Sequence, residues 1–177
     1  MAERLLSSPL AAAGQAGYFD PMAVVTLVEL KEKLGPGRRL MGLDVGVRTI
    51  GIAVSDSGLS VASGIETIRR GKFMPDAERL RQLAVERNVG GLVIGLPINM
   101  DGSEGPRCQS VRQFAQNLLE RFDLPLAFWD ERLSTAAVTR AMLEADLTRR
   151  QRARGVDMAA ASYILQGALD ALRPRTS

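Results

Sequence analysis

The acidic residue Asp44 lies within the first of two apolar segments in the stretch 40–56, which have the composition of central β-strands. A buried carboxylate is unfavourable unless a partner neutralises it. Two apolar segments joined by a short polar turn predict a β-hairpin, and Gly42 and Gly46, at alternate positions beside Asp44, leave room on its face. A hydrated divalent cation is the natural candidate for that space. The alternative is a strand-end carboxylate that accepts hydrogen bonds from backbone amides.

Two further acidic sites are expected to reach the same region. Asp130 and Glu131 follow the apolar run 126–129 and precede a predicted helix start at Ser134, while Asp157 opens the Ala-rich segment 155–172. At 100° per residue the Asp157 carboxylate is expected to point toward the packed side of its helix, because it shares a face with Ala160, Ala161, Ile164 and Ala168. Adjacent strand residues point to opposite faces, so only one of Asp130 and Glu131 can join Asp44 directly.

The composition limits the chemistry that these carboxylates can carry out. The 177 residues, 46% hydrophobic and 24% charged, are typical of one soluble globular domain. A single Cys and no His exclude disulfides within the chain, Cys/His zinc sites, imidazole acid–base chemistry and triads that need His. An aromatic content of 5% argues against an extensive base-stacking platform, whereas a net charge of +3 permits a polyanionic partner.

The first 38 residues are expected to be an extension of the domain. The Ser-Ser-Pro sequence at 7–9 argues against a signal peptide, and no run approaches the ~20 apolar residues of a membrane span. A short helix is predicted over 22–34, closed by the Gly-Pro-Gly sequence at 35–37. We therefore divide the chain into an N-terminal extension, 1–38, a candidate flexible segment, and a domain, 39–177.

The remaining pattern predicts three strands in a meander, followed by alternating helices and strands. After the hairpin we expect a strand at 59–68, a helix opening at Pro75 and ending at 88–91, a strand at 92–96, a helix from about residue 103, and a strand at 124–129. This is the order of a ribonuclease H-like α/β fold, a five-stranded mixed sheet flanked by helices. In that fold the first and fourth strands are neighbours, which brings strand-end carboxylates near one another.

Four sequence blocks occur in a specific order: DVGVRTIGIAVSD at 44–56, GLPINMDGSE at 95–104, DERLST at 130–135 and VDMAA at 156–160. Together they resemble the signature blocks of the YqgF family, the Holliday-junction-resolvase-like pre-16S rRNA nucleases. The resemblance runs from about Arg39 to Leu172. A lone Asp-x-Gly on a strand also occurs in actin-like ATPases, but those need a second lobe that this chain is too short to supply.

The resemblance implies a ribonuclease H-like fold, a bacterial cytoplasmic setting and nuclease chemistry on structured nucleic acid. It implies that Asp44, Glu131 and Asp157 are the catalytic acids and metal ligands. We favour Glu131 over Asp130 as the ligand after the fifth strand, and Asp130 stays the alternative. Mg²⁺ or Mn²⁺ prefers such oxygen ligands, activates water for attack on phosphorus and stabilises the leaving 3′-oxygen.

Several residues near these acids are candidates for binding substrate phosphates. Asn99 and Ser103 lie in a strand-to-helix loop whose amides could hold a phosphate; the alternative is a plain turn with Ser103 as the helix N-cap. Arg48 and Arg132 are expected either to contact phosphate or to pair with an acid. Phosphate contact is favoured over a solvated surface for the basic run Arg149, Arg150, Arg152 and Arg154.

The function that explains all three acids and the basic run is a metal-dependent endonuclease. Processing of the 5′ end of pre-16S rRNA during ribosome biogenesis is the favoured activity, and resolution of branched DNA is an alternative. A catalytically silent RNA-binding factor in ribosome assembly is a further alternative, but it leaves the acids without a role. The expected partner is therefore nucleic acid and not a membrane; further candidate partners are ribosomal precursor particles and a second copy of the chain.

Overall fold

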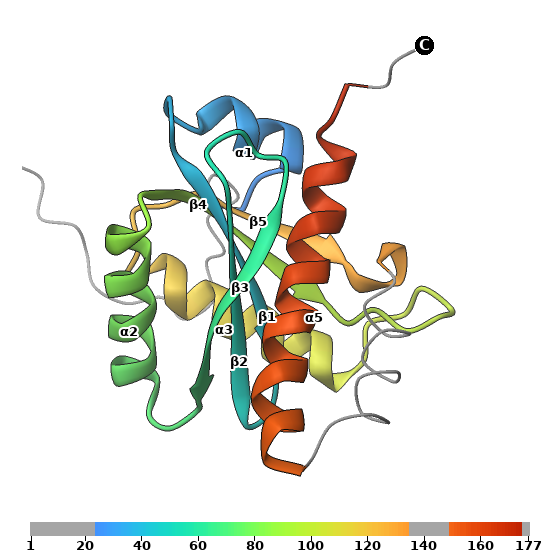
Figure 1. Ribbon diagram of the computed structural model, residues 1–177. Helices are drawn as coiled ribbons and strands as arrows, with labels where there is room; N and C mark the ends of the chain where they lie inside the picture. Colours follow the sequence, from blue (N-terminus) through green and yellow to red (C-terminus); the bar gives the residue numbers. More distant parts are fainter. Residues whose placement is uncertain (1–23, 135–148, 175–177) are drawn as a thin grey trace, which may run out of the picture.

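The computed structural model describes residues 24–134 and 149–174, and in the last helix it describes side chains from residue 155 onward. Five strands form one mixed sheet in the order β3-β2-β1-β4-β5 (Figure 1). Their bounds are Arg39–Val45 for β1, Thr49–Ser55 for β2, Ala62–Arg69 for β3, Val89–Leu96 for β4 and Leu126–Asp130 for β5. The first three strands are antiparallel neighbours, whereas β4 runs parallel to β1 and β5. The predicted ribonuclease H-like order, with the first and fourth strands adjacent, is confirmed.

Helices cover both faces of this sheet (Figure 1). On one face, α2 (Phe73–Glu86) and α3 (Pro106–Leu119) form a core cluster with Met41, Leu43 and Val45 of β1. On the other face, α5 (Arg149–Ala171) packs on Leu40 and on central residues of β2, β4 and β5. Because β1 is covered on both faces, every residue after Arg39 in this strand is buried.

The segment before β1 packs on the same face as α5. Helix α1 (Leu27–Lys33) begins with a capping box, in which the Glu29 backbone amide donates to Thr26 Oγ1 and the Thr26 amide donates to Glu29 Oε2. Its Leu30 side chain is fully buried, and the Val25 amide donates to the Leu126 carbonyl of β5 at 2.9 Å. The domain boundary at residue 38 stays a prediction, but the described residues before it are joined to the sheet by these contacts.

Some element bounds differ from the sequence-based expectation. Helix α2 begins at Phe73, before Pro75, and α3 begins at Pro106, later than residue 103. Residues 88–91 were expected to end a helix, whereas β4 already begins at Val89. A short 3-10 helix, η1 (Glu131–Leu133), follows β5 directly, and the helix predicted from Ser134 falls on residues outside the described part.

None of the helices in the described ranges is both long and apolar enough to cross a lipid bilayer.

Candidate functional site

Asp44 is buried on β1, with 6% of its surface exposed, and pairs with Gly51 on β2. Residues that lie opposite each other on neighbouring strands share a face of the sheet. A Cβ atom on Gly51 would lie 2.5 Å from the carbonyl carbon of Asp157 and closer still to its oxygen, so the backbone of α5 fills the space where a side chain would be. The first turns of α5 therefore place the backbone of Asp157 over Gly51, the neighbour of Asp44 on β2.

Glu131 approaches the same face from the other side of β1. Its Oε1 atom lies 2.7 Å from the position of a Cβ atom on Gly95, and Ile164 of α5 lies against the same glycine. Leu43 of β1 pairs with Ile94 of β4, so the next step along these parallel strands puts Gly95 level with Asp44. The structure therefore brings the three predicted acids to one end of one face, with Asp44 in the middle.

Asp130 lies apart from this group. Trp129 belongs to the core cluster under α5, and the strand pleat turns Asp130 to the opposite face. Its carboxylate accepts hydrogen bonds from the Arg132 backbone amide at 3.0 Å and from Arg132 Nη2 at 2.6 Å. The hydrogen bonds and charge of Arg132 lower the pKa of Asp130. Of the two interpretations of Arg132, pairing with an acid is the one that the structure shows.

The loop between β4 and α3 is held by its own hydrogen bonds at the same end of the sheet. Ser103 Oγ donates to Asp101 Oδ1 at 2.6 Å and accepts from Asn99 Nδ2 at 3.0 Å, while the Asn99 amide donates to the Ser103 carbonyl at 2.9 Å. These bonds from Ser103 lower the pKa of Asp101. The N-cap of α3 is Gly105, so the expectation that Ser103 could cap this helix was wrong. Asn99 and Ser103 instead present exposed polar groups on a loop of defined shape.

The structure describes the Arg48 side chain but only the backbone of the basic run before Asp157. Arg48 is exposed in the turn between β1 and β2, close in sequence to Asp44, and its carbonyl accepts from the Arg70 amide at 2.8 Å. The basic run forms the first turns of α5 directly before Asp157, and its side chains lie outside the described part of the structure: Arg149, Arg150, Arg152 and Arg154.

The donor chemistry of the three acids fits a hard divalent cation, although they do not form a closed cluster. Carboxylate oxygens are the ligands that Mg²⁺ and Mn²⁺ prefer. Gly51 and Gly95 lie on the strands on either side of Asp44, and their lack of a side chain makes room for the Asp157 backbone and the Glu131 carboxylate. Among residues 24–134 and 149–174, no three Cys, Asp or Glu side chains stand ready as a metal site. The two glycines lie on strands two positions apart in the sheet, about 10 Å from each other.

The glycines that matter at this site are not the two singled out in the sequence. A Cβ atom on Gly42 would lie 2.6 Å from Leu165 Cβ, so α5 fills the space that was assigned to a cation. At Gly46 the nearest atom is the Thr49 carbonyl oxygen at 3.0 Å. The register of the β1–β2 hairpin, which sets Gly51 opposite Asp44, could have identified Gly51 from the sequence. Nothing in the sequence indicated the role of Gly95 beyond its place in one of the four sequence blocks.

Comparisons with known proteins agree with this arrangement. A family model described as RuvX, Holliday junction resolvase, matches residues 38–171. The chain is 59% identical over 157 residues to the "Putative pre-16S rRNA nuclease" of Rhodospirillum centenum, a match that covers 86% of this chain and 84% of the relative. It is 62% identical over 138 residues to the protein of the same name from Roseobacter denitrificans, covering 77% of this chain and 85% of that one.

Among solved structures, the fold is similar to that of T. thermophilus RuvC in complex with a Holliday junction substrate. The TM-score is 0.50 at 12% identity, and the match covers 76% of this chain and 94% of RuvC. At this identity the likeness concerns the fold alone, and it agrees with the strand order described above. The family resemblance that the four sequence blocks predicted is confirmed, and the chain belongs to the RuvX (YqgF) family.

Proposed function

We propose that this protein is a metal-dependent nuclease that hydrolyses phosphodiester bonds at the Asp44 end of its sheet. The observation that carries this proposal is the position of Asp44, buried between Asp157 on one side and Glu131 on the other, on one face of the sheet. Three carboxylates at one end of one face supply the oxygen ligands that a hard divalent cation prefers. Membership of the RuvX family supports the same activity.

Asp44, Glu131 and Asp157 would hold Mg²⁺ or Mn²⁺. When bound, such an ion lowers the pKa of a water molecule and stabilises the leaving oxygen. Asp44 is fixed by the sheet and Asp157 by the contact of its backbone with Gly51, so both are positioned by rigid elements. Glu131 is the first residue of η1, directly after β5, and its carboxylate lies over Gly95 of β4.

Nucleic acid would approach this end of the sheet along exposed loops. The loop that carries Asn99 and Ser103 and the turn that carries Arg48 flank the acids and offer hydrogen-bond donors to phosphate oxygens. Arg132 is held next to this loop, where its charge acts on Asp101. The basic run before Asp157 would neutralise further phosphates. These contacts supply the positive charge without which the acids would repel the substrate.

The proposed substrate is the 5′ region of pre-16S rRNA, with the cytoplasm as its setting. The names of relatives that are 59% and 62% identical over most of their length support this choice. Branched DNA is the second candidate substrate, favoured by the description of the family model as a Holliday junction resolvase. Ribosomal precursor particles and a second copy of the chain stay predicted partners.

A cleavage assay with matched variants tests the proposal. A pre-16S rRNA fragment and a four-way DNA junction are incubated with Mn²⁺ and without it. Asp44→Asn is expected to abolish cleavage, because the amide keeps the size of the side chain but loses the charge. Asp76→Asn is the control, since Asp76 is equally buried at 6% exposure but lies on α2 and accepts from the Gly71 amide. Full cleavage by folded Asp44→Asn would contradict the proposal.

The same assay decides between the two acids that follow β5. Glu131→Gln is expected to lose activity far more than Asp130→Asn, because only Glu131 reaches the face that carries Asp44. The opposite ranking in a metal titration would make Asp130 the ligand. It would also mean that the pairing of Asp130 with Arg132 breaks when the metal binds.

A further inference from the structure

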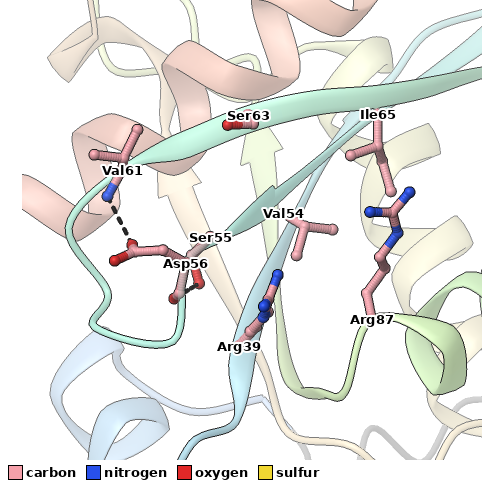
Figure 2. A pocket seen from close by; sticks show the side chains of 8 residues that line it. All are labelled: Arg39, Val54, Ser55, Asp56, Val61, Ser63, Ile65 and Arg87. Carbon is pink, nitrogen blue, oxygen red and sulfur yellow. Dashed lines mark hydrogen bonds between the residues drawn. The ribbon is translucent and has the colours of Figure 1, made fainter.

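A hollow of about 390 Å³ lies at the other end of the sheet from the acids (Figure 2). Its walls include Val54 and Ile65, which pack with the core on the α2 side of the sheet, and the side chains of Arg39 and Arg87. Arg39 is the first residue of β1, five positions before Asp44, a distance of about 16 Å along the strand. The hollow is therefore separate from the proposed nuclease site in both position and face.

Two arginines line this hollow, and their guanidinium groups have no anion partner within the described structure. Neither Arg39 nor Arg87 forms a side-chain hydrogen bond or ion pair with residues 24–134 or with the described side chains of α5. Some arginines of the described chain are paired with an acid, as Arg79 is with Glu66 at 2.6 Å and Arg132 is with Asp130 at 2.6 Å. Arg39 and Arg87 have no such pair and line the same hollow. Figure 2 shows both guanidinium groups on the side of the hollow that Val54 and Ile65 line.

The acid that lines the hollow does not neutralise them. Asp56 turns its carboxylate to the backbone amide of Val61 at 2.9 Å (Figure 2) and to that of Ser60 at 2.7 Å, and these hydrogen bonds lower its pKa. Two guanidinium groups against one carboxylate leave the hollow with a net positive charge. Ser63 adds a hydroxyl group to the same wall.

We propose that this hollow binds a phosphate group of a nucleotide, either free or within a nucleic-acid chain. A guanidinium presents a planar fork of donors that matches phosphate oxygens, and it stays charged at every physiological pH. The volume falls in the range of small-ligand pockets, and Val54 and Ile65 give an apolar wall against which a sugar or base can pack. This site is additional to the proposed nuclease function and does not depend on it.

A pair of matched variants of the full chain tests the site. Arg87→Gln removes one charge from the hollow, and Arg121→Gln removes one from an exposed arginine elsewhere. Both residues follow 14-residue helices, and both donate their backbone amides to the preceding helix, to Leu83 and Leu118 respectively. Arg39→Gln is a second variant within the hollow. Melting temperatures show that each variant is folded, and since Arg87 is exposed, its loss leaves the core intact.

Two probes distinguish the sources of the phosphate. ADP is titrated by calorimetry, and a labelled RNA is titrated by fluorescence anisotropy in Ca²⁺ at several salt concentrations. A free nucleotide site is supported if Arg87→Gln weakens ADP binding at least fivefold while Arg121→Gln does not. A nucleic-acid contact is supported if the salt slope for RNA flattens by about 0.7 in Arg87→Gln alone. Equal behaviour of the two variants with both probes would overturn the proposal, whether or not the protein cleaves RNA.

Discussion

Replacing Gly51 by alanine should separate α5 from the sheet. The new Cβ atom would lie 2.5 Å from the carbonyl carbon of Asp157, whereas ordinary contacts begin at 3.4 Å. The carbonyl oxygen is closer still, so the helix has to move by more than about 0.9 Å. The obstacle is backbone, which cannot rotate away as a side chain could. Overpacking usually costs about 1–3 kcal/mol, and we expect the upper end of this range for the free energy of unfolding.

Urea denaturation followed by tryptophan fluorescence measures this effect. Trp129 is the single tryptophan and packs against Gly167 of α5, so its emission reports on the contact between helix and sheet. A loss of about 3 kcal/mol corresponds to a melting temperature lower by about 6–12 °C for a chain of this size. Cleavage should fall as well, because Asp157 moves away from Asp44.

Gly71→Ala is the matched control. A Cβ atom on Gly71 would meet nothing within 4 Å, so the substitution should be neutral or stabilising by about 0.4–1 kcal/mol through the unfolded state. A Gly51→Ala protein within 1 kcal/mol of the wild type would show that α5 does not rest on β2 as described.

Three further predictions concern the acids and the basic run. Gly95→Ala would put a Cβ atom 2.5 Å from Ile164 Cδ1 and 2.7 Å from Glu131 Oε1. Both atoms are ends of side chains that can rotate, so we expect a cost of about 1–2 kcal/mol but at least a tenfold loss of cleavage. Unchanged cleavage would contradict the placement of Glu131. Because Arg132 lowers the pKa of Asp130, the contribution of this pair is present above the unfolded pKa of about 3.9 and is lost as the pH falls through the lower folded value. At pH 7 the Asp130→Asn protein should be less stable than the wild type by about 0.5–1 kcal/mol. Denaturation curves should show this difference shrinking below pH ~4. A difference that stays constant with pH would mean that the ion pair is not its cause. The last change replaces the four arginines of the basic run by alanine: Arg149, Arg150, Arg152 and Arg154. The slope of log RNA affinity against log salt concentration, measured in Ca²⁺, should flatten by about 3. A run that only contacts solvent would change this slope by well under 1.

The order of the elements along the chain and the burial of Asp44 could be predicted because both follow from local patterns, whereas the adjacency of β1 and β4 came from the fold that this order indicates. Alternation and apolar runs identify central strands, and the pleat decided that Glu131 and Asp130 point to different faces. The placement of Glu131 over Gly95 agrees with that argument, while its role as a ligand stays a prediction.

Contacts between distant segments could not be predicted in the same way. Residues 88–91 look like a loop because glycines usually interrupt regular structure, yet Gly91 belongs to β4. A Cβ atom there would lie 2.8 Å from Leu30 Cδ1, so the glycine is needed to seat α1, about 60 residues earlier in the chain. The pair of Asp130 and Arg132 likewise depends on the 3-10 turn of η1, which no periodicity in the sequence indicated.

The position of α5 in the chain has a consequence for biosynthesis. Because α5 follows all five strands in the sequence, the ribosome synthesises every strand before it makes the helix that covers one face of the sheet. Until then the sheet residues that α5 covers, such as Val93 and Ala127, lack this partner, and Asp44 lacks the neighbour that Asp157 provides. Because a domain generally folds as a unit, the strands cannot complete their core until α5 has been synthesised. The proposed nuclease would therefore be inactive during its own translation. It would become active only when α5 packs on the sheet and brings Asp157 next to Asp44.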